Sequence, residues 1–217
     1  MIRLYRAHWS TNCERVALAL AHKVLNVESV VIDYSDRSVV ERVSGQPLVP
    51  VIEDGDEVVH DSTAILRHLE RRFGGPRLFP TDPRGTGEMD VFLSWFNEVW
   101  KSAPNAVAAE MEKTEPDRGA IESAAASLAG WLDTFERLLD GREFLMGERL
   151  SAADCAAFPF LKYACRRDPA DDELFHRILE EHQTIEDRPR LAAWIDRVDA
   201  LPRAYGPTVA EHGRSGP

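Results

Sequence analysis

Residues 45–65 read GQPLVPVIEDGDEVVHDSTAI, and this stretch decides the fold of the first part of the chain. Two runs rich in β-branched residues, 49–53 and 57–59, flank Asp54-Gly55, which is a strong signal for a hairpin turn. A helical pattern then runs over 62–73, with its apolar residues on one side. The stretch therefore predicts a β-hairpin that is followed directly by a helix.

Upstream of the hairpin, strand and helix signals alternate. The sequence predicts a short strand at 2–5, an amphipathic helix at 14–24, a β-branched strand at 27–33 and a short helix at 38–43. The full order is β-α-β-α-β-β-α. A βαβ unit with a hairpin and a closing helix is the thioredoxin-like arrangement, so we expect an α/β domain here.

The second part of the chain is predicted to be all-helical. Structure-breaking residues, Gly74-Gly75-Pro76 and Pro80-Thr81-Asp82-Pro83, separate it from the first part. We expect domains at 1–78 and 88–217, joined by a linker at 79–87. Apolar residues recur at helical spacing in three places, namely between Met89 and Trp100, between Leu128 and Leu139, and between Leu191 and Leu201. The stretch after Pro202 is expected to be weakly ordered.

Composition excludes several classes of partner. Lys plus Arg total 26 against 37 Asp plus Glu, which gives a formal charge of −11 and argues against nucleic acid or anionic lipid. The first residues lack the apolar core of a secretory signal, and no stretch has the length of a membrane span. The three cysteines are too few and too scattered for a disulfide framework or a paired metal site. We therefore expect a cytoplasmic protein with no metal.

Four motifs stand in a fixed order along the chain. They are 10–16 (STNCERV), 45–52 (GQPLVPVI), 61–65 (DSTAI) and 147–154 (GERLSAAD). Together they resemble cytosolic glutathione transferases over nearly the whole chain up to about Leu201. The class stays open among serine-type, zeta, nu and omega-like members. The resemblance implies the two-domain glutathione transferase fold, a thioredoxin-like domain followed by an all-α domain.

The resemblance implies a binding set for glutathione. The bond between Val49 and Pro50 would be cis, and the backbone of Val49 would pair with the cysteinyl part of the tripeptide. Ser62, which begins a helix, would hold the γ-glutamyl carboxylate, and Asp61 would face its ammonium group. Gln46 lies where family members contact the glycyl end and is a weaker candidate. Simple helix capping by Asp61-Ser62 is the alternative interpretation of that pair.

The residues 10–13 limit the chemistry of the site. Thioredoxin-like oxidoreductases carry Cys-x-x-Cys at this point, but a serine, Ser10, stands at the first position and cannot form a mixed disulfide. A hydroxyl at the start of a helix can instead stabilise the thiolate of glutathione. We rank Ser10 first for this role, Asn12 second and Thr11 third. Cys13 is expected to be a packed and largely inert thiol; the alternative is that its position near a helix N-terminus lowers its pKa and makes it reactive.

Several other residues are expected to be structural. Ser151 and Asp154 have the spacing of a capping box at the start of a helix. Arg15 is expected to be a solvated helix residue by default, and the alternative is that it orients the loop or contacts glutathione. Trp9, Trp100 and Tyr163 are weak candidates for lining an apolar site, because aromatic residues at helical spacing more often belong to a core.

The sequence thus predicts a glutathione transferase that presents the glutathione thiolate to a small hydrophobic electrophile, in the manner of a detoxifying enzyme. Two alternatives stay open: a glutathione-dependent isomerase of the zeta type, and a non-catalytic binding or scaffold protein of the same fold. Another low-molecular-weight thiol is also compatible with the sequence. The resemblance suggests a homodimer.

Overall fold

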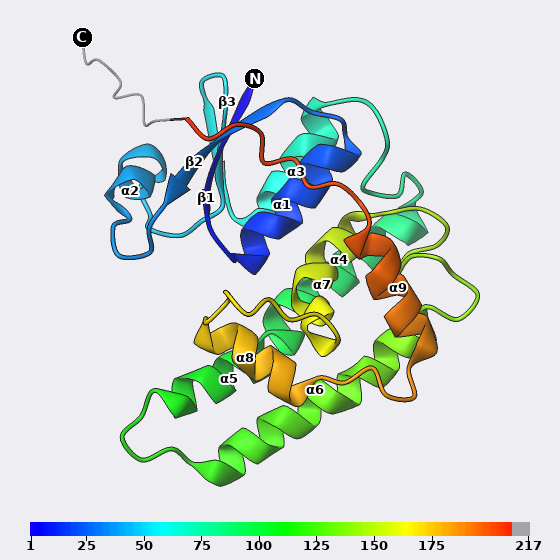
Figure 1. Cartoon of the computed structure of the whole chain (residues 1–217). Coiled ribbons are helices and arrows are strands. Elements are labelled where there is room, and N and C mark those ends of the chain that lie inside the picture. Colours follow the sequence, from blue (N-terminus) through cyan, green and yellow to red (C-terminus); the bar gives the residue numbers. More distant parts are fainter. Residues whose placement is uncertain (210–217) are drawn as a thin grey trace. The chain divides into compact units, whose positions relative to one another are not determined.

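A four-stranded mixed sheet forms the centre of the first unit in the computed structural model, which describes residues 1–209 (Figure 1). The strand order is β2-β1-β3-β4, with β1 parallel to β2 and antiparallel to β3. The elements follow the chain as β1 (Ile2–Ala7), α1 (Thr11–His22), β2 (Val27–Ile32), α2 (Ser38–Ser44), β3 (Val51–Asp54), β4 (Glu57–His60) and α3 (Ser62–Arg72). The predicted β-α-β-α-β-β-α order is confirmed.

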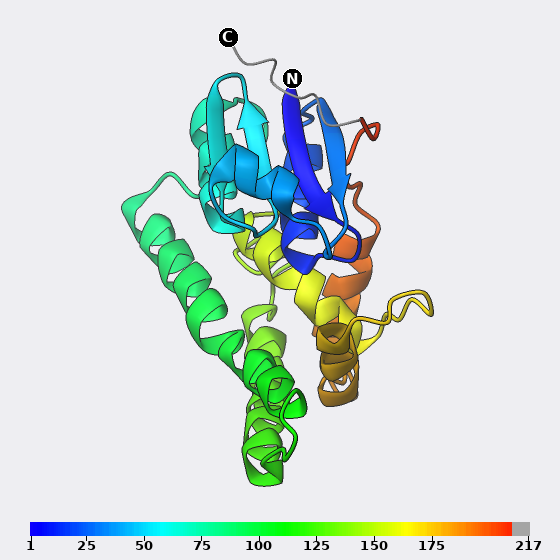
Figure 2. The same ribbon diagram turned by 90° about the vertical axis from the view of Figure 1, so that its left-hand side faces the viewer.

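The two faces of this sheet are covered by different helices. Figure 2 shows α2 on one face of the sheet and α1 with α3 on the other. Val40 of α2 packs in a buried cluster with Tyr5, Val30 and Val51. Because side chains alternate along a strand, Leu4 and Ile52, both fully buried, belong to the opposite face. The alternation in the sequence thus gives the sheet two apolar faces, as expected for a thioredoxin-like layer.

The second unit, residues 79–201, is helical. Its helices are α4 (Pro83–Ser94), α5 (Ser102–Met111), α6 (Arg118–Leu138), α7 (Ala152–Leu161), α8 (Leu174–His182) and α9 (Pro189–Asp199), with a π-helical turn η1 (Trp95–Trp100) and a 3₁₀ turn η2 (Lys162–Ala164). The prediction of an all-α second part is confirmed. No helix within residues 1–209 has both the length and the apolar character needed to cross a membrane.

An aromatic core holds the start of this second unit together. The rings of Phe96 and Trp100 stack with centroids 4.6 Å apart, and Phe160 of α7 meets both edge-on. The sequence predicts one helix from Met89 to Trp100, whereas the structure widens its last part into η1. In a π turn the residues are spaced differently, and Val99, which the pattern placed among the apolar positions, is 44% exposed.

The structure groups the chain differently from the expected domain borders. Residues 202–209 belong with residues 1–78 and not with the helices, and α4 already begins at Pro83 inside the expected linker 79–87. Pro83 at the first helical turn fits this start, because its missing N–H has no helical partner there. The second unit is therefore an insertion in the chain of the first.

The segment 202–209, expected to be weakly ordered, lies along the edge strand β2 and pairs with it at one isolated bridge, between Thr208 and Ser29. The backbone of Ser29 in β2 accepts from Val209 N at 2.8 Å and donates to Pro207 O at 2.9 Å. Gly206 allows this approach: it has φ +63°, and a Cβ at this position would lie 1.8 Å from the carbonyl oxygen of Val27. As far as residue 209 the expectation was wrong, because the order of this segment comes from distant partners and not from a local pattern; the rest of that stretch, residues 210–217, lies outside the described residues.

Candidate functional site

The pairing of the strands brings three loops to one end of the sheet. Tyr5, Val51 and His60 form one row across β1, β3 and β4. Because β3 runs opposite to both neighbours, the chain leaves β1, enters β3 and leaves β4 at the same end. These three loops carry the site residues that the sequence predicted. The residues predicted to contact the thiol, the cysteinyl backbone and the γ-glutamyl group of glutathione thus lie at the same end of the sheet.

Ser10 caps the helix that follows the first of these loops. It is the N-cap of α1, and its Oγ accepts a hydrogen bond from the N–H of Cys13 at 3.3 Å. Ser10 and Asn12 are partly exposed, while Thr11 is buried. The helix end adds a partial positive charge beside the Ser10 hydroxyl. The arrangement suits an anion such as a thiolate near Ser10.

The second loop leads into β3 through a cis bond between Val49 and Pro50. The amide of Gln46 bonds inside this loop: its Nε2 donates to Ser44 Oγ and to Leu48 O, and its Oε1 accepts from Leu48 N. Among residues 1–209, no hydrogen bond uses the backbone N–H or C=O of Val49. Gln46 therefore shapes the loop, and Val49 offers a donor and an acceptor for an extended peptide.

The third loop is a single strained residue at the start of α3. Asp61 has φ +69°, which is uncommon for a residue other than glycine, and its Oδ1 accepts from Ala64 N at 2.9 Å. Ser62 is buried, and its Oγ accepts from Arg15 Nη1 at 3.2 Å. Capping by Asp61 is therefore present in the structure. Since the Ser62 oxygen accepts from Arg15, its own proton is available to donate.

The default interpretation of Arg15 was wrong. The side chain was expected to be solvated, but Arg15 is only 1% exposed and joins α1 to α3 through Ser62. Nearly every residue of the first turns of α1 is buried, so its helical pattern has no polar face on which to place an arginine. A charged residue within a run of buried residues is the signal that was available.

Cys13 lies in the first turn of α1, three residues after Ser10. It is 1% exposed, and burial raises its pKa to about 11, although hydrogen bonding from Ser10 and the Ala7 backbone opposes the shift. The free value is about 8.5, so the thiolate fraction at neutral pH is about two orders of magnitude smaller than that of an exposed cysteine.

We predict that Cys13 in the native protein reacts with iodoacetamide about 100-fold more slowly than a free thiol. Peptide mass spectrometry of timed samples measures the rate, with Cys165, which is only partly buried, as the internal comparison. Unfolded protein, in which all three cysteines are accessible, serves as the control. Alkylation of Cys13 as fast as that of Cys165 would contradict this account.

Two aromatic candidates for an apolar site belong to the core of unit 2. Trp100 is fully buried in the stack with Phe96. The hydroxyl of Tyr163 donates to Asp171 at 2.8 Å, and its ring stacks on His176. Trp9, in unit 1, is 42% exposed. The structure therefore assigns Trp100 and Tyr163 to packing.

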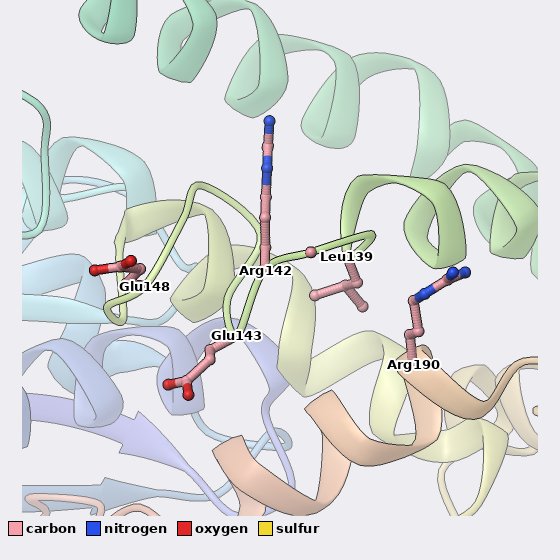
Figure 3. Close-up of a pocket in the computed structure, with 6 residues that line it drawn as sticks. Leu139, Arg142, Glu143, Glu148 and Arg190 are labelled. Carbon is pink, nitrogen blue, oxygen red and sulfur yellow. The ribbon is translucent and has the colours of Figure 1, made fainter.

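Unit 2 also carries a charged hollow of about 600 Å³ (Figure 3). Arg142 and Arg190 line it, and their side chains diverge in Figure 3. Arg190 is paired with Glu136 and Asp140, while Arg142 donates to the carbonyl of Leu145. Both cations already have protein partners. In the described part of the chain, no three His, Cys, Asp or Glu side chains are grouped so as to hold a metal ion.

The comparisons with known families match both halves of the chain. The family described as "Glutathione S-transferase, N-terminal domain" matches residues 4–77, and "Glutathione S-transferase, C-terminal domain" matches residues 117–197. The first match includes all three loops of the site.

Individual proteins give the same result. The chain is 30% identical over 162 residues to glutathione S-transferase theta-3 of Mus musculus, covering 70% of this chain and 61% of that protein. It is 30% identical over 156 residues to glutathione S-transferase 2 of Onchocerca volvulus, covering 70% and 71%. A crystal structure of a glutathione S-transferase from Methylobacillus flagellatus KT with GSH bound is 21% identical, with a TM-score of 0.74, covering 91% and 94%.

Proposed function

This chain belongs to the glutathione S-transferase family, and we propose that it binds glutathione at the three loops and transfers its sulfur to a small electrophile. The observation that carries the proposal is the meeting of these loops at one end of the sheet. One loop holds a hydroxyl at a helix start, the next a backbone with free hydrogen-bonding groups, and the third a strained aspartate before a helix.

Each part of the tripeptide then has a partner of fitting chemistry. The N–H and C=O of Val49 pair with the cysteinyl backbone as a neighbouring strand would. The start of α3 receives the γ-glutamyl carboxylate, with a hydrogen bond from the Ser62 hydroxyl. The carboxylate of Asp61, exposed and fixed by its cap, faces the γ-glutamyl ammonium. Gln46 holds the shape of the loop at the glycyl end.

The reaction needs one proton transfer and one displacement. The thiol of glutathione has a free pKa of about 8.5, so most of it is protonated at neutral pH. A hydrogen bond from Ser10 and the positive end of α1 favour the thiolate. The proton goes to solvent, the sulfur forms a bond to carbon, and the leaving group departs with its electron pair. The products are the thioether and the acid of the leaving group.

The electrophile, the cytoplasmic location and the homodimer remain proposals drawn from the family. The chain spans about 61% of the length of the mouse theta-3 protein, so the activity of that whole protein does not transfer by itself. A wild-type assay for conjugation of glutathione to chlorodinitrobenzene tests the reaction class directly. Retention on immobilised glutathione without turnover on a panel of electrophiles would favour a non-catalytic binding protein.

A sharper test concerns recognition of the γ-glutamyl group. Replacement of Ser62 by alanine is predicted to weaken glutathione binding by about 10-fold or more, because a hydrogen bond to a charged group is worth about 1.5–3 kcal/mol. Cysteinylglycine lacks this group, so the change should leave its affinity unaltered. Isothermal titration measures the affinities for glutathione and for cysteinylglycine. The ratio of these two affinities does not depend on the folded fraction of the variant.

The matched control is Ser123→Ala, which removes a hydroxyl from an exposed position of α6. Its affinity for glutathione should equal that of the wild type. If Ser62→Ala lowers the affinities for glutathione and cysteinylglycine by the same factor, the start of α3 does not receive the γ-glutamyl end.

A further inference from the structure

A carboxylate lies in the same helical turn that is proposed to activate the thiol. Glu14 belongs to the first turn of α1 and is only 8% exposed. Its N–H donates to the carbonyl of Ser10 at 3.0 Å, which places it one turn beyond the cap. A buried negative charge at this point opposes a thiolate beside Ser10, because like charges disfavour ionisation. The site therefore requires a compensating cation.

That cation comes from the other end of the described chain. Arg203 donates from both Nε and Nη2 to the Oε1 of Glu14, at 3.1 and 3.0 Å. Both side chains are shielded, with 15% and 11% of their surface exposed. A guanidinium that donates twice in a sheltered place interacts more strongly than a surface pair. The helix start thus keeps its positive character despite Glu14.

The segment that carries Arg203 is fixed to unit 1 by backbone hydrogen bonds of the residues that follow Arg203. The N–H of Ala204 donates to the carbonyl of Ala17 in α1 at 3.0 Å. Further along, the segment pairs with Ser29 of β2, as described above. Figure 1 shows it running from α1 across to β2. The main chain beside Arg203 is consequently held against α1, and the two hydrogen bonds to Glu14 orient its guanidinium.

Other charged or titratable groups also surround Glu14. The phenol of Tyr205, on the same segment, has a raised pKa because it is buried and faces the charge of Glu14. The guanidinium of Arg6, from β1, lies over the Tyr205 ring at 4.4 Å from its centroid. Cys13, on α1 itself, is protonated at neutral pH. From α3, which packs on α1, Ser62 bonds to Arg15.

We propose that Arg203 is a positioning residue of the thiol site, which offsets the charge of Glu14 and so keeps the thiol of bound glutathione ionised. The proposal rests on the function proposed above. Arg203 touches neither ligand nor reacting atom; it acts through Glu14 and α1. Through Arg203, the 202–209 segment accordingly contributes to the function of the glutathione-binding unit, although it follows the helical unit in sequence.

The test is a double-variant cycle with the ionisation of bound glutathione as its readout. Arg203→Ala should raise the apparent pKa of the bound thiol by about one pH unit, measured by the ultraviolet absorbance of the thiolate and by the pH profile of kcat/KM. The value of kcat/KM at neutral pH should fall up to about 10-fold and recover at higher pH. Adding Glu14→Gln to Arg203→Ala should return the thiol pKa to that of the wild type.

Two further variants separate charge from mere packing. Arg203→Lys keeps the charge and should keep the pH profile, whereas Arg84→Ala, which breaks an exposed ion pair with Glu88 on α4, should change nothing. If Arg203→Ala leaves the thiol pKa unchanged, or if the double variant shows the same shift as the single one, the proposal is overturned. Absence of glutathione binding in the wild type would instead refute the proposed function.

Discussion

Replacement of Asp154 by alanine is expected to lower the free energy of unfolding of the helical unit by about 3–5 kcal/mol. Asp154 is fully buried at the start of α7. Its Oδ2 accepts from the N–H of Ser151 at 2.9 Å and from its hydroxyl at 2.6 Å. Its Oδ1 accepts from the N–H of Leu145 and from Nε1 of Trp194, at 2.8 and 2.9 Å. Alanine would leave these donors buried without a partner.

Urea unfolding followed by tryptophan fluorescence and circular dichroism measures this loss. Ser151→Ala is the graded comparison, because it removes one capping hydroxyl and should cost about 0.5–2 kcal/mol. Asp154→Asn retains an oxygen acceptor, so its loss in free energy of unfolding should lie between those of Ser151→Ala and Asp154→Ala. Failure of Asp154→Ala to fold agrees with the prediction, provided that Asp154→Asn folds and is destabilised. A loss below that of Ser151→Ala would show that the carboxylate is not the centre of this junction.

Replacement of Ser10 by alanine is expected to lower kcat/KM for conjugation by about 10- to 100-fold at neutral pH. A hydrogen bond to an anion contributes about 1.5–3 kcal/mol, and that stabilisation is lost when the thiolate has no hydroxyl partner. The affinity for glutathione should change little, because Val49 and the start of α3 hold the rest of the tripeptide. The apparent pKa of the bound thiol should rise in parallel. Steady-state kinetics as a function of pH measures both effects.

The neighbouring residues provide the controls for this prediction. Ser10→Thr keeps a hydroxyl at the cap and should retain most of the activity. Asn12→Ala should have a smaller effect than Ser10→Ala, and Thr11→Ala mainly a structural one, since Thr11 is buried. Loss of activity in Asn12→Ala together with an unaffected Ser10→Ala would transfer the role to Asn12.

The sequence was sufficient for those parts of the fold that have a local cause. The Asp54-Gly55 turn, the alternation of the strands and the helix starts at Ser62 and Ser151 each act over a few residues. The signals within residues 1–78 predicted the strand and helix order of unit 1 correctly. The capping box of Ser151 and Asp154 is confirmed by its hydrogen bonds.

The remainder depends on contacts between distant residues. Arg203 and Glu14 are far apart in the chain, and Pro202 and Gly206 break any period that would announce an ordered segment. The pattern within α1 leaves no polar face for Arg15, but its partner, Ser62, comes from α3, which packs on α1. The three loops of the site were found by resemblance, while their common edge follows from the strand register. These features depend on pairing between residues that are far apart in the sequence, which local patterns do not predict.

The insertion of the helical unit within the sheet unit has a consequence for biosynthesis. When residues 1–78 have left the ribosome, β2 still presents unpaired backbone groups, and residues 202–209 arrive only after the whole helical unit has been translated. During that interval the nascent sheet can add a strand from another polypeptide. Completion of the first folding unit thus waits for nearly the last stretch of the described chain. Premature termination before Arg203 would release a product that has an open edge of β2 and lacks the ion pair between Arg203 and Glu14.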